Sequence, residues 1–160
     1  MRAVCSQIFI HIIFPVKDAN NLIPQEHLEE LHSIMAGIIS KKGQERVLVG
    51  GTSSHIHAFF DMKPEVIVSN FIKSIKNESA KFINQQQWLI KKFSWHEDYG
   101  AFSYSHSQVE KVCEYIKNEE NHHKTMTFRE EFVAFLNKFN VEYDEEDLPI
   151  DFEKRIVSEL

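Results

Sequence analysis

At residues 53–61 the chain reads Ser-Ser-His-Ile-His-Ala-Phe-Phe-Asp. The alternation predicts a β-strand, because successive side chains of a strand point to opposite faces of a sheet. The apolar residues would then face a core, whereas His55 and His57 would lie side by side on the other face. Two imidazoles held in this way can bind one divalent metal ion through a nitrogen each. A histidine pair in a chain with nine histidines can also be a coincidence, so the pair needs a partner elsewhere in the chain.

The composition predicts one globular domain. The chain has 160 residues, of which 42% are hydrophobic, enough to bury a core. Its cysteines, Cys5 and Cys113, have no spacing typical of a disulfide framework or a zinc site. The longest apolar run, residues 8–16, is much shorter than the roughly 20 residues of a membrane-spanning helix. We therefore expect a soluble cytoplasmic protein without a membrane partner.

The charge is unevenly distributed. The whole chain carries a net charge of −6, and residues 141–160 alone hold eight acids and two bases. We therefore divide the chain into a domain at residues 1–140 and an acidic tail at residues 141–160. The tail is either a solvated terminus, which we favour, or a segment that folds against a basic surface. An acidic total does not exclude a basic surface within the domain.

Hydrophobic periodicity and turn residues predict the elements of the domain. The expected strands are residues 4–16, 45–49, 54–61, 93–95 and 101–104. The expected helices are residues 24–43, 64–84, a helix that begins at a capping box at Ser107, and 127–139. The order βαββαβ indicates an α+β fold, with an antiparallel sheet covered by helices on one face. This arrangement is ferredoxin-like or RNA-recognition-like, with an added helix after the last strand.

The added helix carries Tyr115 and, one turn further on, Glu119. Residues four apart lie on the same face of a helix, so a phenol and a carboxylate are held side by side. If this helix lies across the open face of the sheet, Glu119 can join His55 and His57 as a third metal ligand, with Glu120 as a lesser candidate. Tyr115 would then lie next to the metal. His11 also interrupts an apolar strand, and we interpret it as a hydrogen-bonded strand histidine rather than a ligand.

Three ordered motifs extend this pattern over most of the chain. They are Gly50-Gly51 through His55-Ile56-His57, Tyr99-Gly100-Ala101-Phe102-Ser103, and Glu114-Tyr115-Ile116-Lys117-Asn118-Glu119-Glu120-Asn121-His122-His123-Lys124 followed by Thr127-Phe128. Together they resemble the single-tyrosine HUH transposases of small bacterial insertion sequences, over about residues 5–148. The resemblance implies His55 and His57 as metal ligands, Tyr115 as the nucleophile and Glu119 in the third-ligand position.

The resemblance also implies an activity. Such an enzyme depends on Mg²⁺ or Mn²⁺, binds single-stranded DNA with hairpin ends, and cleaves and rejoins it through a 5′-phosphotyrosine. It works as a homodimer in which one subunit's tyrosine helix can complete the partner's site in trans. Lys73, Lys76 and Lys81 form a basic stripe that would contact DNA phosphates, although such a stripe is also typical of a solvated helix face.

Several aromatic residues are candidates for stacking on unpaired bases, although most aromatic residues of such a chain belong to the core. These candidates are Phe59, Trp88, Trp95 and Phe102. Two further functions stay open. The first is a domesticated relative, or an RNA-recognition-like domain, that binds structured nucleic acid without cutting it. The second is a histidine-metal hydrolase acting on a small ester.

Overall fold

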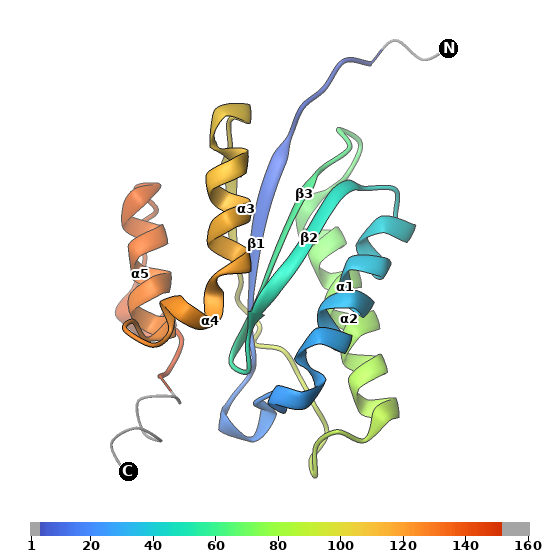
Figure 1. The fold of residues 1–160 in the computed structure, drawn as a ribbon, viewed down its shortest axis with the longest axis vertical. Helices are drawn as coiled ribbons and strands as arrows, with labels where there is room; N and C mark the ends of the chain where they lie inside the picture. The colour runs from blue at the N-terminus through green and yellow to red at the C-terminus, as the bar shows by residue number, and fades with distance from the viewer. Residues whose placement is uncertain (1–3, 152–160) are drawn as a thin grey trace.

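The computed structural model describes residues 4–151 and contains one antiparallel sheet (Figure 1). Its strands, in the order β2-β3-β1-β4, are Glu45–Thr52 (β2), His55–Asp61 (β3), Phe9–Pro15 (β1) and Gly100–Tyr104 (β4). Every pair of neighbouring strands is antiparallel. In the register, Ile13 of β1 pairs with His57, and His11 pairs with Phe59, so the three histidines share one face.

Helices cover both faces of this sheet (Figure 1). The first face carries α1 (Leu28–Lys41) and α2 (Val68–Gln86), and the second carries α3 (Val109–Lys117), α4 (Glu119–His122) and α5 (Phe128–Lys138). Short 3₁₀ helices lie at Ala19–Asn21, Gln25–His27, His106–Gln108 and Glu145–Asp147. Because β1 is central and covered on both faces, all seven of its residues are buried, which explains its almost uninterrupted apolar sequence.

Two apolar cores result from this layering. The first lies between the sheet and helices α1 and α2 and contains the alternate residues Ile56, Ala58 and Phe60 of β3. The second lies between the other face and helices α3 and α5, and it contains Phe9 and Phe59. The histidine face is therefore itself covered by protein, so the chemistry of the site lies inside the second core.

The predicted α+β fold and its βαββαβ order are confirmed. The prediction put the helices on one face with the tyrosine helix as an addition, and the structure shows that α5 joins α3 on the second face. Residues 93–95 are not a strand: only Trp95 forms an isolated bridge, with Val16. The Trp95 indole is instead anchored by donating to Ser79 Oγ at 2.9 Å.

The capping box lies two residues earlier than predicted. It joins Ser105 and Gln108 around the 3₁₀ helix that precedes α3, rather than starting at Ser107. The tyrosine helix also ends earlier, because it is interrupted at Asn118 and continues as the short helix α4. Tyr115 and Glu119 are therefore on separate helical segments, although both still face the sheet.

The chain beyond residue 140 also packs on the domain. Leu148 is buried in the second core, and Asp151 accepts a hydrogen bond of 2.9 Å from the backbone N–H of Arg129. The division at residue 140 stays a prediction, and residues 152–160 of the acidic tail lie outside the described residues. Between residues 4 and 151, no helix has the length and apolar character needed to cross a bilayer.

Candidate functional site

Strand β3 presents His55 and His57 to the second face, where both side chains are completely buried. Each ring turns its Nε2 atom toward the same pair of carboxylates. His55 Nε2 lies 3.0 Å from Glu119 Oε1 and 3.1 Å from Glu131 Oε1, and His57 Nε2 lies 3.2 Å from Glu131 Oε1. His57 also contacts Glu119 Oε1. One ligand atom from each of these four residues lies within 4.8 Å of the others.

The other ring nitrogens of the histidines are held by neighbouring polar groups. His55 Nδ1 lies 2.9 Å from Ser54 Oγ and 3.1 Å from Thr52 Oγ1. His57 Nδ1 lies 2.6 Å from His11 Nε2, and His11 Nδ1 lies 3.2 Å from the Tyr104 hydroxyl. Such partners fix the ring orientation of metal-binding histidines. The interpretation of His11 as a hydrogen-bonded strand histidine is thereby confirmed.

Helix α5 covers the histidines on the second face of the sheet. Phe128 stacks on the His55 ring, with centroids 3.8 Å apart, and Glu131 follows one turn later with its side chain fully buried. Thr127 caps this helix by accepting a hydrogen bond of 3.2 Å from the backbone N–H of Glu130. The cap fixes where the helix begins, and therefore where Glu131 points.

The histidines compensate the charge of the two buried acids. Burial alone lowers the pKa of His57, but the carboxylates of Glu131 and Glu119 outweigh burial and raise this pKa to about 9. Burial likewise lowers the pKa of His123, and Glu119 and Glu131 reverse the effect and raise it to about 10. For Glu119, burial raises the pKa, but hydrogen bonds from His123, His55 and His57 lower it to about 2.

Tyr115 lies at the edge of this cluster. Its hydroxyl donates a hydrogen bond to Glu131 Oε2, and its ring stacks on His122 with centroids 4.2 Å apart. Burial, together with the negative charge of Glu131, raises the pKa of the Tyr115 phenol, so the phenol keeps its proton at neutral pH. One carboxylate thus connects the tyrosine hydroxyl to the two histidines.

These residues have the chemistry of a divalent-metal site. Two imidazole nitrogens and two carboxylate oxygens are suitable ligands for Mg²⁺ or Mn²⁺, and three of the four had been predicted from the sequence. Glu119 Oε2 is buried without a hydrogen-bond partner among the residues described. A buried carboxylate oxygen in this state is suited to a cation.

Glu131, the fourth member of the cluster, was not predicted from the sequence. A signal existed, because Glu131 follows Phe128 by three residues and precedes Phe135 by four, and so falls on the apolar stripe of its helix. An acid on such a stripe needs a partner. The lesser candidate Glu120 is exposed and accepts a hydrogen bond of 3.0 Å from Gln25 Nε2, so it lies outside the cluster.

The predicted DNA contacts lie away from the cluster. Lys73, Lys76 and Lys81 belong to α2, which covers the first face of the sheet. Lys76 donates to the carbonyls of His96 and Glu97 at 2.8 and 3.0 Å, whereas the other two lysines are exposed.

The predicted stacking residues are mostly part of the cores. Phe59, Trp95 and Phe102 are buried, so as placed they cannot stack on a base. Trp88 is half-buried and already stacks on the His27 ring, with centroids 4.4 Å apart.

Comparison with known proteins gives a consistent assignment. The family of IS200-like transposases matches residues 4–119, which include Tyr115 and Glu119. The ISDra2 transposase TnpA of Deinococcus radiodurans is 23% identical over 123 residues, covering 74% of this chain and 88% of the relative.

Two solved structures share the fold. The first is a crystal structure of a protein assigned as a transposase from Deinococcus radiodurans R1, with a TM-score of 0.55 and 21% identity, covering 74% of this chain and 95% of that one. The second, a REP-associated tyrosine transposase bound to a REP hairpin, has a TM-score of 0.52 and 10% identity, covering 99% and 84%. The family match spans most of the chain and agrees with the motifs in the sequence, so this protein belongs to the family of IS200-like transposases.

Proposed function

We propose that this protein is a metal-dependent, single-stranded DNA transposase that cleaves and rejoins DNA at element ends through a 5′-phosphotyrosine at Tyr115. One observation carries the proposal: the Tyr115 hydroxyl is hydrogen-bonded to Glu131, whose other oxygen lies beside both histidines. The proposed nucleophile and the proposed metal ligands are thus in contact within one chain. Membership of the transposase family supports the same activity.

His55, His57 and Glu119 would hold the metal ion, with Glu131 as a fourth ligand that also positions the nucleophile. When bound, Mg²⁺ or Mn²⁺ stabilises the negative charge that develops on the phosphate during substitution. Thr52, Ser54 and His11 keep the imidazoles in the orientation that this binding requires. The hydrogen bond to Glu131 keeps the Tyr115 oxygen directed toward this proposed metal site.

In the proposed reaction, one residue, Tyr115, becomes covalently bonded to the DNA. The Tyr115 oxygen loses its proton and forms a bond to the phosphorus of a DNA phosphodiester, while the bond from phosphorus to the 3′-oxygen breaks. The 3′-oxygen leaves and takes up a proton, and the 5′-phosphate remains on Tyr115. Attack by another 3′-hydroxyl reverses these steps and releases the tyrosine, so the strand is rejoined without an external energy source.

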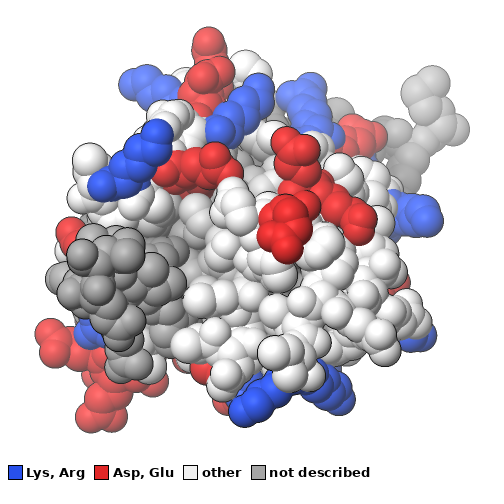
Figure 2. Space-filling model, turned by 60° about the horizontal axis from the view of Figure 1, so that its bottom comes forward, with Lys and Arg blue, Asp and Glu red and all other residues white. Residues whose placement is uncertain are grey.

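Single-stranded DNA with hairpin ends is the proposed partner, and a neighbouring structure of the same fold is bound to a REP hairpin. Lys73, Lys76 and Lys81 stay proposed contacts of the DNA phosphates. Figure 2 shows that acids and bases are scattered over one end of the molecule, around a broad uncharged surface. A homodimer is proposed, with each Tyr115 beside the histidines of its own chain.

The test uses single strands copied from the DNA on both sides of the reading frame. With Mg²⁺ or Mn²⁺, the wild-type protein should form a covalent adduct that carries the 5′ end of the cleaved product. Tyr115→Phe should abolish the adduct and keep the affinity for the strand, and EDTA should stop cutting. An adduct formed by the Phe variant would exclude Tyr115 as the nucleophile.

A non-cutting nucleic-acid-binding protein is the second candidate. The observation that favours it is burial, since the side chains of His55, His57 and Glu131 are completely buried. Such a protein would bind the same strand with or without EDTA and never form an adduct. The two functions are therefore separated by one denaturing gel.

A further inference from the structure

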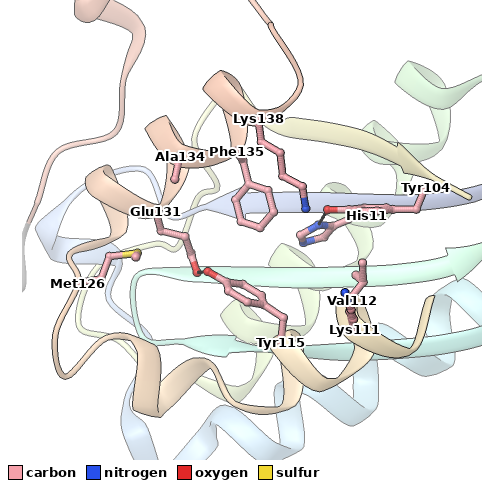
Figure 3. Close-up of a pocket in the computed structure, with 10 residues that line it drawn as sticks. All are labelled: His11, Tyr104, Lys111, Val112, Tyr115, Met126, Glu131, Ala134, Phe135 and Lys138. Carbon is pink, nitrogen blue, oxygen red and sulfur yellow. Dashed lines mark hydrogen bonds between the residues drawn. The ribbon is translucent and has the colours of Figure 1, made fainter. Parts of the chain in front are cut away.

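A pocket of about 300 Å³ opens between α3 and α5, directly beside the Tyr115 hydroxyl (Figure 3). The floor is formed by His11 of β1 and Tyr104 of β4, and the two helices form the walls. Tyr115 and Glu131 lie at one end, joined by their hydrogen bond. A volume of this size is in the range of small-ligand sites.

The walls of the pocket are apolar and aromatic. Phe135 projects from α5 into the space opposite Val112 and Tyr115 (Figure 3). Its ring is held in place by stacking on Phe102, with centroids 5.5 Å apart. At the floor, the Tyr104 hydroxyl and His11 Nδ1 lie 3.2 Å apart. The floor of the pocket therefore contains groups that can form hydrogen bonds.

Two lysines line the same pocket, Lys111 from α3 and Lys138 from α5. Both are exposed. Lys138 Nζ lies 5.6 Å from the centroid of the Tyr104 ring and 5.5 Å from that of Phe139, over both aromatic faces. Within residues 4–151, neither lysine forms an ion pair with a carboxylate. Their charges are therefore available to an anion that enters the pocket.

We propose that this pocket binds the unpaired nucleotide next to the scissile phosphate, with its base against the aromatic wall and its backbone phosphate at Lys111 and Lys138. This inference rests on the proposed function, because Tyr115 can attack a phosphodiester only if the adjoining nucleotide lies beside it. The pocket combines what a single-stranded nucleotide needs: an aromatic surface, hydrogen-bonding groups and two cations.

The experiment combines a filled pocket with a scan of the DNA. Ala134 lines the pocket but is exposed on α5, so Ala134→Trp can occupy the space while the core stays intact. The probe is the single strand from the element's end, with an abasic site placed at each position in turn. Affinity is measured in EDTA by fluorescence anisotropy, so that the result does not depend on cutting.

We expect one abasic position to weaken binding to the wild type roughly tenfold, as loss of one stacked base does. Ala134→Trp should weaken binding to the intact strand by a similar factor. Its affinity for the strand with that abasic site should then be no lower than its affinity for the intact strand. Lys111→Ala and Lys138→Ala should each lower the slope of log affinity against log salt by about one.

Two matched variants serve as controls. Asn137→Trp adds the same side chain at an exposed position of α5 that does not line the pocket, and Lys41→Ala removes an exposed lysine on the first face. Both should bind like the wild type. Unchanged binding by Ala134→Trp would overturn the proposed role of the pocket. A further loss of affinity when Ala134→Trp binds the abasic strand to which the wild type is sensitive would overturn it as well. Binding that follows the expected pattern without any Tyr115 adduct would refute the proposed function and leave the pocket standing.

Discussion

At Glu131 the two oxygens of one carboxylate face different partners. Oε2 accepts the hydrogen bond from Tyr115, whereas Oε1 lies 3.1 Å from His55 Nε2 and 3.2 Å from His57 Nε2. Glutamine has nearly the same shape, but it replaces one oxygen by an NH₂ group and removes the negative charge. One substitution therefore tests both contacts without leaving a cavity.

We predict that Glu131→Gln slows formation of the Tyr115 adduct about 10- to 100-fold, the usual range for groups that orient a metal site. Affinity for the DNA strand, measured in EDTA, should stay within about twofold of the wild type, a change of roughly 0.4 kcal/mol. The matched control is Glu130→Gln, because Glu130 is the preceding residue and is exposed. Equal rates of adduct formation for the two variants would show that Glu131 has no role in the reaction.

The sequence indicated three of the four clustered residues because strand periodicity and helical spacing act over short distances. His55 and His57 alternate with core residues, and Glu119 follows Tyr115 by four positions. Glu131 lies on another helix, and its position depends on how α5 packs over the second face. Periodicity marks the buried stripe of that helix, but it does not say which surface the stripe meets.

At the scale of elements, the position of α3 depends on a glycine in β2. A Cβ atom at Gly50 would lie 2.9 Å from both the carbonyl oxygen and Cγ2 of Ile116, the residue that follows Tyr115. The strand and the helix therefore approach more closely than any side chain at position 50 allows. This contact holds α3, which carries Tyr115, against β2, the strand next to the histidine strand β3.

We predict that Gly50→Ala lowers the free energy of unfolding by about 1–3 kcal/mol, because the extra methyl group overpacks this contact. Adduct formation should fall as well, since α3 must shift. By contrast, a Cβ at Gly37, inside α1, would meet nothing within 4 Å, so Gly37→Ala should stabilise the protein by about 0.5–1 kcal/mol. Urea unfolding of both variants measures the difference, and a stabilising Gly50→Ala would disprove the close contact.

Helix ends and irregular segments were harder to predict than the strands. The helix break at Asn118 does not interrupt the apolar pattern of the sequence. The backbone angles of Asn118, φ −101° and ψ 19°, therefore cannot be predicted from hydrophobic periodicity. Residues 93–95 have the composition of a strand, but Trp95 packs in the first core, where its indole N–H donates a hydrogen bond to Ser79. Tertiary packing decided both cases over local preference.

At the scale of the whole molecule, the folded unit extends past the start of the acidic tail. We predict that Leu148→Ala lowers the free energy of unfolding by about 2 kcal/mol, because it empties a buried position of the second core. Ile150→Ala should change it by less than about 0.5 kcal/mol, since that side chain is 60% exposed. Thermal unfolding compares them, and equal effects would place the end of the domain before residue 148.

The contact between Tyr115, Glu131 and the two histidines is made within a single polypeptide. Two differently damaged copies should therefore be unable to repair each other. We predict that an equimolar mixture of Tyr115→Phe and His57→Ala proteins, unfolded and refolded together, yields no covalent adduct beyond the sum of the separate proteins. Activity recovered on mixing would mean that subunits exchange their tyrosine helices. Without such exchange, each copy would be a self-sufficient cutting unit, and the proposed pairing would serve only to bring two DNA ends together.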